Sequence, residues 1–234
     1  GTITSSVSAN PSAGFSIVSY TGTGSNATIG HGLASAPTLL IVKKRIQNGS
    51  DGARGWAVYS DASVLGNAKS LYLNTTNNAF TATNFWNSTT PTSSVFSIGS
   101  GTSSQETNIN GDAYIAYCFH NVDGYSKVGS YKGTTVNAGS FVHTGFKVAF
   151  VLIKTMFDGD PWVMMDAARD PYNVATKRLR SDSSAAETTD AQLTCDFLSN
   201  GFKPYGNSYH INGNGQTYLY IAFAESPFKH TNAR

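Results

Sequence analysis

The sequence predicts an all-β protein made of two tandem repeats of an antiparallel β-sandwich, of jelly-roll or lectin-like type, packed against each other. Its apolar residues come in short, strand-sized runs rich in Val, Ile, Tyr and Phe, and clusters of Gly, Asn, Ser and Thr separate the runs. Helical character is confined to residues around 166–180, where Pro171 interrupts it. Several strings also recur along the chain, which is typical of an internal repeat.

The apolar runs define the strands that we expect. They lie at residues 15–20, 38–44, 56–59, 70–74, 95–98, 113–119, 128–131, 150–154, 162–166, 177–180, 194–198 and 217–224. A further strand is expected at residues 2–8, followed by a turn at Asn10-Pro11.

The repeat is carried by four pairs of strings. Ser-Tyr-Thr-Gly at 19–22 recurs as Ser-Tyr-Lys-Gly at 130–133, and Leu-Leu-Ile-Val-Lys at 39–43 recurs as Phe-Val-Leu-Ile-Lys at 150–154, both at an offset of 111. Trp56 then matches Trp162, and Tyr-Ile-Ala-Tyr at 114–117 matches Tyr-Ile-Ala-Phe at 220–223, both at an offset of 106. We interpret the two tryptophans as core residues.

These strings divide the chain into three parts. Residues 1–14 form an N-terminal linking strand, residues 15–123 the first repeat and residues 124–234 the second. Each repeat holds enough strands for a sandwich or jelly roll, and the sequence leaves open whether they make two sandwiches or interleave into one. The junction at 121–124 is too short for a flexible tether, so we expect the halves to pack together.

Composition excludes several classes of partner. The 28 Ser, 25 Thr, 19 Asn and 23 Gly make up 95 of the 234 residues, whereas Asp, Glu, Lys and Arg number only 30, with a net charge of +2. Such a surface gives little support to nucleic-acid binding. No apolar stretch is long enough to cross a bilayer, so membrane insertion is not expected. Buried thiols are favoured over a disulfide for Cys118 and Cys195.

Several strings resemble one known family. They are GFSIVSYTG at 14–22, HGL at 31–33 followed by Pro37, IVKKR at 41–45, YCF at 117–119, DGYSK at 123–127, DFLSNGFK at 196–203 and AFAESPFK at 222–229. Together they resemble the duplicated C-terminal domain of tail-fibre-like proteins of marine tailed bacteriophages, which often follows a concanavalin-A-like lectin domain.

The resemblance implies a location and partners, but it supplies no catalytic or binding residues. It implies a virion protein on the phage tail or particle surface that contacts a host cell-surface polysaccharide or other receptor and other virion subunits. A homotrimer is expected, as in a fibre.

Aromatic side chains are the strongest candidates for binding. Rings stack on the apolar faces of sugars, and amide and hydroxyl groups bond their hydroxyl edges. We therefore interpret rings in predicted loops, with the neighbouring asparagines, as glycan contacts, with loop anchoring as the alternative. These candidates are Trp86, Asn87, Tyr172, Asn173, Tyr205, Asn207 and Tyr209.

Enzyme chemistry is the weaker interpretation, and no catalytic residue is assigned. A glycosidase needs two facing carboxylates, and Asp158, Asp160, Asp166 and Asp170 cluster around Trp162. The segment around Asp166 is more typical of a strand end that turns, with Arg169 pairing an aspartate.

Metal binding is likewise not predicted, and calcium is the one cofactor left open. Asp158 and Asp160 flank a glycine in an oxygen-rich loop, but Asx and Gly are also ordinary hairpin residues. His31 and His143 are expected to shape turns or bond carbonyls.

The sequence therefore predicts a non-enzymatic phage domain that attaches to the host cell surface by binding glycans. A purely structural role, as a capsid decoration or fibre cap, is the alternative. A polysaccharide depolymerase acting through the aspartates at 158–170 is a third hypothesis.

Overall fold

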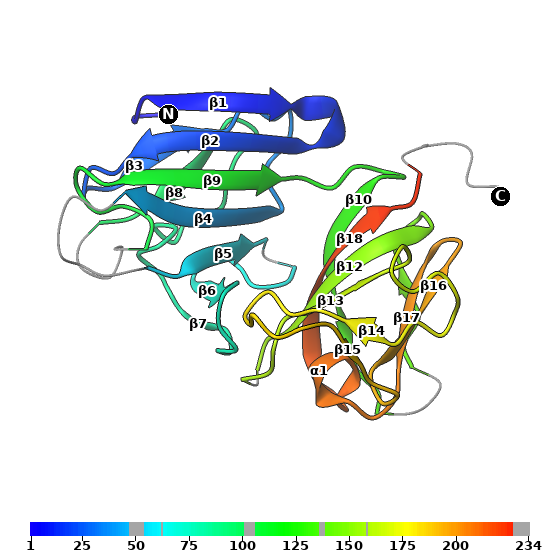
Figure 1. The fold of residues 1–234 in the computed structure, drawn as a ribbon. Coiled ribbons are helices and arrows are strands. Elements are labelled where there is room, and N and C mark those ends of the chain that lie inside the picture. Colours follow the sequence, from blue (N-terminus) through cyan, green and yellow to red (C-terminus); the bar gives the residue numbers. More distant parts are fainter. Residues whose placement is uncertain (47–53, 62, 101–105, 136–138, 158, 227–234) are drawn as a thin grey trace. The chain divides into compact units, whose positions relative to one another are not determined.

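The computed structural model describes residues 1–46, 54–61, 63–100, 106–135, 139–157 and 159–226 (Figure 1). These residues are nearly all strand, and the paired strands are antiparallel, which confirms the all-β prediction. By their contacts they form two compact units. Unit 1 consists of Gly1–Leu73 and Ala79–Asn121, and unit 2 of Asn74–Asn78 and Val122–Arg234.

Unit 1 contains a seven-stranded sheet and a two-stranded sheet (Figure 1). The large sheet has the order β1 (Ser5–Asn10), β2 (Phe15–Thr21), β9 (Ala113–Phe119), β4 (Leu39–Ile46), β5 (Trp56–Ser60), β6 (Lys69–Tyr72) and β7 (Phe80–Thr81). The small sheet pairs β3 (Ala27–Gly30) with β8 (Val95–Ile98). A short 3-10 helix, η1 (Pro11–Ala13), joins β1 to β2, and the Asn10 side chain caps it.

The core of unit 1 lies on one face of the large sheet. In β2 every second residue is buried, so Val18 and Tyr20 point inward while Ile17 and Ser19 point to the other face. The inward residues pack with Ile29 and others from β3 and β8. This alternation makes unit 1 a sandwich-like layer pair, as the sequence predicts.

Unit 2 contains three sheets. A four-stranded sheet has the order β10 (Ser126–Lys132), β18 (Thr217–Ala224), β12 (Val148–Thr155) and β13 (Val163–Asp166). A three-stranded sheet has the order β11 (Val142–His143), β17 (Gly201–Tyr205) and β16 (Thr194–Leu198), and β14 (Lys177–Arg178) pairs with β15 (Thr188–Thr189). One helical turn, α1 (Tyr209–Asn212), follows β17. The core of unit 2 includes Val151, Phe202 and Cys195.

Each of the two units contains a pair of stacked tyrosines. In unit 1 the rings of Tyr20 and Tyr114 lie 5.2 Å apart, and the Tyr20 hydroxyl donates to the carbonyl of Thr107. In unit 2 the rings of Tyr131 and Tyr218 lie 5.0 Å apart, and the Tyr131 hydroxyl donates to the carbonyl of Ile211. Because these buried hydroxyls are bonded, each pair can sit in the core without an unmet polar group.

A buried asparagine beside each tyrosine pair ties two loops together. In unit 1 the Asn108 side chain accepts from the N–H of Thr23 and donates to the carbonyls of Ser25 and Gly99. In unit 2 Asn212 accepts from the N–H of Thr134 and donates to the carbonyl of Gly206. We call each of these an asparagine clamp.

The tyrosine pair within each unit shows which residues of β9 and β18 occupy equivalent positions. Tyr20 pairs with Tyr114 and, 111 positions later, Tyr131 pairs with Tyr218, so β18 follows β9 at an offset of 104. The sequence comparison matched Tyr114 to Tyr220, two residues away. A slip of two residues keeps every side chain on the same face of a strand, so the apolar pattern alone could not detect it.

Replacing Asn108 with alanine is expected to lower the free energy of unfolding of unit 1 by about 2–3 kcal/mol. The change leaves buried backbone groups without partners, each at a cost of about 1–3 kcal/mol. Denaturant unfolding followed by tryptophan fluorescence measures the loss. Asn110→Ala serves as the control, because Asn110 is an exposed asparagine two residues away. Equal stabilities of the two variants would contradict a structural role for the clamp.

One local expectation is wrong. The first strand spans Ser5–Asn10 rather than 2–8, because residues 5–10 pair with residues 15–20 of β2 and only Ile3 bridges to β3. The segment after Asp166 turns, as expected, and the carboxylates of Asp166 and Asp170 accept hydrogen bonds from its backbone. Among the described residues, none of the helices is long and apolar enough to span a membrane.

Candidate functional site

The outer face of the three-stranded sheet of unit 2 presents a group of exposed and half-buried side chains. Val142, Phe202 and Phe197 pair across the sheet and are buried on its inner side. Strand alternation therefore places their neighbours outward. We call this outer surface the Tyr205 face. Its members from the three strands and the residue before β11 are Phe141, His143, Asp196, Leu198, Lys203 and Tyr205.

A charged and hydrogen-bonded cluster lies at the centre of the Tyr205 face. The Tyr205 hydroxyl donates to Asp196 Oδ2 at 2.6 Å, and Lys203 Nζ lies 5.0 Å from the centre of the Tyr205 ring. The hydrogen bond to Asp196 raises the pKa of Tyr205 to about 12, so the phenol stays protonated at neutral pH. The bond also fixes the tilt of the Tyr205 ring, and a ring of fixed tilt loses little entropy on stacking.

Aromatic and apolar side chains border this cluster. Phe141 is 49% exposed, and a Cβ on Gly201 would lie 3.0 Å from its ring, so the ring covers the bare backbone at that glycine. On the far side of β16, Ala175 pairs with Cys195, which extends the sheet by one short segment. The step between neighbouring strands is about 4.8 Å, so the four rows span about 14 Å, enough for a short oligosaccharide.

Asn173 holds the loop beside β16. Its side-chain amide donates to the carbonyl of Phe197 and its side-chain oxygen accepts from the N–H of Phe197, both at 3.0 Å. These two hydrogen bonds to the strand leave the neighbouring residues in solvent, where Tyr172 is 81% and Val174 46% exposed. Tyr172 therefore has the exposure that a sugar contact needs, whereas the Asn173 side chain is engaged in holding the loop.

Trp86 is not a surface residue. It is 1% exposed, its ring lies 5.6 Å from that of Tyr59, and its indole N–H donates to the carbonyl of Lys69. The prediction that Trp86 contacts glycan is wrong, because this tryptophan fills the core of unit 1. Asn87 beside it is half-buried in a left-handed turn, where its carbonyl accepts from the Thr89 hydroxyl.

The remaining glycan candidates follow β17. Asn207 is exposed, and Tyr209 at the start of α1 is 58% exposed while its carbonyl accepts from the Tyr218 hydroxyl. Five of the seven predicted contacts thus lie in unit 2, and Trp86 and Asn87 lie in unit 1. Of the five, Tyr205 is on the Tyr205 face and Tyr172 belongs to the segment that borders β16.

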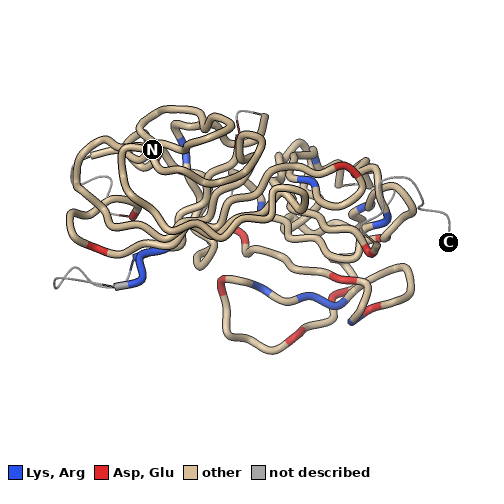
Figure 2. The backbone as a smooth tube through the Cα atoms, turned by 90° about the horizontal axis from the view of Figure 1, so that it is seen from above, with Lys and Arg blue, Asp and Glu red and all other residues tan. Residues whose placement is uncertain are grey.

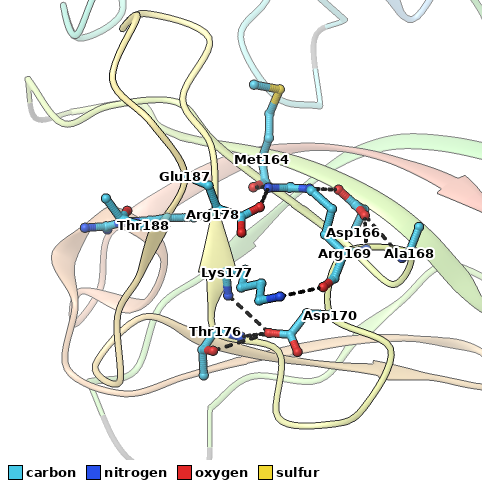
Figure 3. A network of polar contacts seen from close by, with 10 residues as sticks. All are labelled: Met164, Asp166, Ala168, Arg169, Asp170, Thr176, Lys177, Arg178, Glu187 and Thr188. Carbon is cyan, nitrogen blue, oxygen red and sulfur yellow. Dashed lines mark hydrogen bonds and ion pairs between the residues drawn. The ribbon is translucent and has the colours of Figure 1, made fainter.

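The aspartates proposed for depolymerase chemistry are bound within their own loop (Figure 3). Asp166 accepts from the backbone N–H groups of Ala168 and Arg169, and the Arg169 side chain bridges Asp166 and Glu187 at 2.5 and 2.7 Å. The pairing of Arg169 with an aspartate is what the sequence indicates.

Asp170 is also engaged by its neighbours. It accepts from the backbone N–H groups of Thr176 and Lys177, and the bond from Thr176 lowers the pKa of Asp170. A catalytic acid of a glycosidase needs the opposite shift, a raised pKa that keeps its proton. Asp166 and Asp170 therefore hold the loop in shape, and their contacts give no support to the depolymerase hypothesis.

The weak calcium candidates do not form a described metal site. Asp158 lies outside the described residues, and the Asp160 carboxylate is 3.5 Å from His210 Nε2. Burial lowers the pKa of His210, and its Nδ1 accepts from Arg178, so Nε2 carries the proton that faces Asp160. No group of three or more His, Cys, Asp or Glu residues suited to a metal occurs in the described part of the chain.

Sequence reasoning missed Phe141, Asp196 and Lys203, which lie on the Tyr205 face. Asp196, Leu198 and Lys203 are the outward residues of DFLSNGFK, and the turn lies at Ser199 and Asn200, because Gly201 pairs with Leu198. An Asn-Gly pair between two strand-sized runs is a hairpin signal, which could have placed Asp196 and Lys203 on one face. Phe141 could not have been found in this way because β11 has only two residues.

The expectation that His31 and His143 shape turns or bond carbonyls is met in part. His31 is buried in a turn, where Nδ1 accepts from the N–H of Leu33 and Nε2 lies 3.1 Å from the carbonyl of Thr92. His143 is instead exposed on the Tyr205 face, although its carbonyl accepts from Lys127. Figure 2 shows that most of the backbone is tan and that blue and red segments follow one another closely in one loop region.

The fold and this face define a class, an all-β domain with exposed aromatic side chains. The chain belongs to the family described as Domain of unknown function (DUF7483), which it matches over residues 1–227. Neither the curated proteins nor the solved structures contain a match to this chain.

Proposed function

We propose that this chain is a host-attachment domain of a phage virion, carried on a tail fibre or spike, and that it binds glycans on the bacterial surface through the Tyr205 face of unit 2. The observation that carries the proposal is the exposure of Tyr172, at 81%, in the segment that borders β16, the strand of Asp196. An exposed ring of this kind can stack on the apolar face of a sugar. The phage context follows from the sequence resemblance.

The chemistry of the face suits a sugar. Phe141 and Tyr172, at opposite borders of the sheet, offer rings to separate sugar units of an oligosaccharide, and Asp196 and Lys203 between them offer an acceptor and a donor to its hydroxyls. Asp196 Oδ1 is shielded from solvent, so a sugar hydroxyl reaches the carboxylate at Oδ2, beside the bond from the Tyr205 hydroxyl.

Shallow sites of this kind bind weakly, and a fibre compensates by repetition. A millimolar site has a binding free energy of about −4 kcal/mol, and linking several copies on one particle raises the overall affinity by roughly 10²–10⁴. The proposed homotrimer would present three copies of the face. Stacking and hydrogen bonding also persist in sea water, where salt screens charge attraction.

Tyr172→Ala is expected to weaken binding to host polysaccharide about twofold to twelvefold, because a stacked ring contributes about 0.5–1.5 kcal/mol. The measurement uses the fluorescently labelled full chain on marine bacterial strains and their extracted polysaccharides, with free-sugar competition and with EDTA as a calcium test. Phe157→Ala is the matched control, because Phe157 is 56% exposed in unit 2 but lies outside the face.

Three outcomes would contradict the proposal. These are the absence of saturable binding to every strain, equal losses in the Tyr172 and Phe157 variants, and release of reducing sugar by the protein. The first, with the protein shown to be folded, would favour the structural virion role. The last would favour a depolymerase.

One observation favours the structural alternative as a second candidate. Strand β1 is the edge of its sheet and is exposed along most of its length, so its outer edge could pair with a strand of a neighbouring subunit. Ala9→Pro removes a backbone N–H from β1, and a loss of oligomers without a loss of glycan binding would support this role.

A further inference from the structure

Unit 1 has a groove of its own, separate from the Tyr205 face. Two hollows of about 250 and 340 Å³ lie over β1, β2, β4 and β9, and they share Ser6, Ser19 and Arg45. Ser6 pairs with Ser19 across β1 and β2, so the shared serines lie side by side. The serine and threonine hydroxyls that face the groove are those of Thr4, Ser6, Ser8, Ser19 and Thr21, whereas the Ser5 hydroxyl donates to the carbonyl of Gly30.

Arg45 reaches this groove because of a β-bulge. Lys44 pairs with Tyr114 and Ile46 with Ala113, which leaves Arg45 as the extra residue of β4. A bulge redirects the side chains around it. Lys44 turns inward to Asp112 at 2.7 Å, whereas Arg45 is exposed and has no ion-pair partner among the described residues.

The lining has the chemistry of a site for an acidic sugar. Arg45 is the one cationic side chain among the described residues that line the groove, and none of those residues is acidic. A guanidinium presents two parallel N–H donors that match a carboxylate or sulfate. Ile17 and Ile115, on the same side of the sheet as Ser19, offer an apolar surface to the ring of the sugar.

We infer that this groove binds a saccharide bearing a carboxylate or sulfate group, with Arg45 bound to the acidic group and the serine and threonine hydroxyls bound to the sugar hydroxyls. The inference rests on the proposed glycan-binding function and adds a second site and its ligand class.

The groove is specific to unit 1. Strand β1 forms one of its walls, whereas the corresponding sheet of unit 2 begins at β10, the counterpart of β2. At the offset of 111, Met156 stands where unit 1 has Arg45 and Lys132 where it has Thr21. One acidic saccharide per chain is therefore expected.

The test compares dextran sulfate with uncharged dextran of the same length, and an oligomer of glucuronic acid with one of glucose. Isothermal titration of the full chain is expected to show binding of an acidic probe, at one site per chain for a short oligomer, and at least tenfold weaker binding of its neutral counterpart. Arg45→Gln is expected to reduce affinity for the acidic probe at least tenfold, and Arg45→Lys severalfold, because lysine keeps the charge but loses the fork.

Lys132→Gln is the matched control, since it removes one exposed positive charge from unit 2. Unchanged affinity in Arg45→Gln, or equal losses in Arg45→Gln and Lys132→Gln, would overturn the inference. Tyr172→Ala separates the two proposals, because its effect on cell binding tests the Tyr205 face alone. Loss of cell binding in Tyr172→Ala with no effect of Arg45→Gln on acidic probes would refute the groove and leave the proposed function standing.

Discussion

Replacing Lys44 with methionine is expected to lower the free energy of unfolding of unit 1 by about 3–5 kcal/mol. Lys44 Nζ lies 2.7 Å from Asp112 Oδ2, and both side chains are 2% exposed. Removing one partner of such a pair leaves the other charge buried without its counterion, which costs more than the pair itself contributes. Denaturant unfolding of the full chain measures the loss.

Two further variants test this explanation. Lys43→Met makes the same change at the preceding residue, whose ammonium lies over the half-buried Trp56 ring. This variant should lower the free energy of unfolding by about 1 kcal/mol or less. At the offsets of 111 and 104 residues, Thr155 and Gln216 of unit 2 stand at the positions of Lys44 and Asp112, and both side chains are uncharged. The double variant Lys44→Thr, Asp112→Gln should be more stable than Lys44→Met, and the opposite order would refute the argument.

Trp86→Ala is the second large effect, with an expected loss of about 3–5 kcal/mol in the stability of unit 1. The indole is 1% exposed and packs against Tyr59 and Phe85, so its removal leaves a cavity in the core. Differential scanning calorimetry should show a lower Tm for the transition of unit 1.

Trp86→Phe separates packing from hydrogen bonding. It keeps most of the ring volume but removes the N–H that donates to Lys69, at a cost of about 1–2 kcal/mol. If Trp86→Ala instead kept its stability and lost glycan binding, the residue would be a surface contact after all.

The sequence predicted much of the fold because strand patterns are local. The expected strands at 95–98, 113–119, 194–198 and 217–224 have the observed bounds, since each is an apolar or alternating run between turn residues. Strands β3, β7, β11, β15 and β17 are not among the expected strands. Ala27–Gly30 and Val142–His143 are short and contain Gly, Thr or His, and Pro204 interrupts the pattern in β17. Their pairing depends on partners far along the chain.

The site was harder to predict, for a reason that Trp86 and Tyr172 illustrate. Each is an aromatic residue beside an asparagine in a polar loop, so their sequence contexts are alike. Trp86 is buried because its loop folds over the core of unit 1, and Tyr172 is exposed because Asn173 ties its loop to the edge of β16. Burial of this kind is decided by tertiary contacts.

The two cysteines make the stability of each unit separately measurable. Cys118 lies in the core of unit 1 and Cys195 in that of unit 2, and neither is in a disulfide. Burial raises the pKa of Cys118 to about 12 and raises that of Cys195 further, so neither thiol is reactive while its unit is folded. Labelling by a thiol reagent, followed by mass spectrometry, would therefore report the opening rate of each unit in the unmodified protein, without any introduced probe.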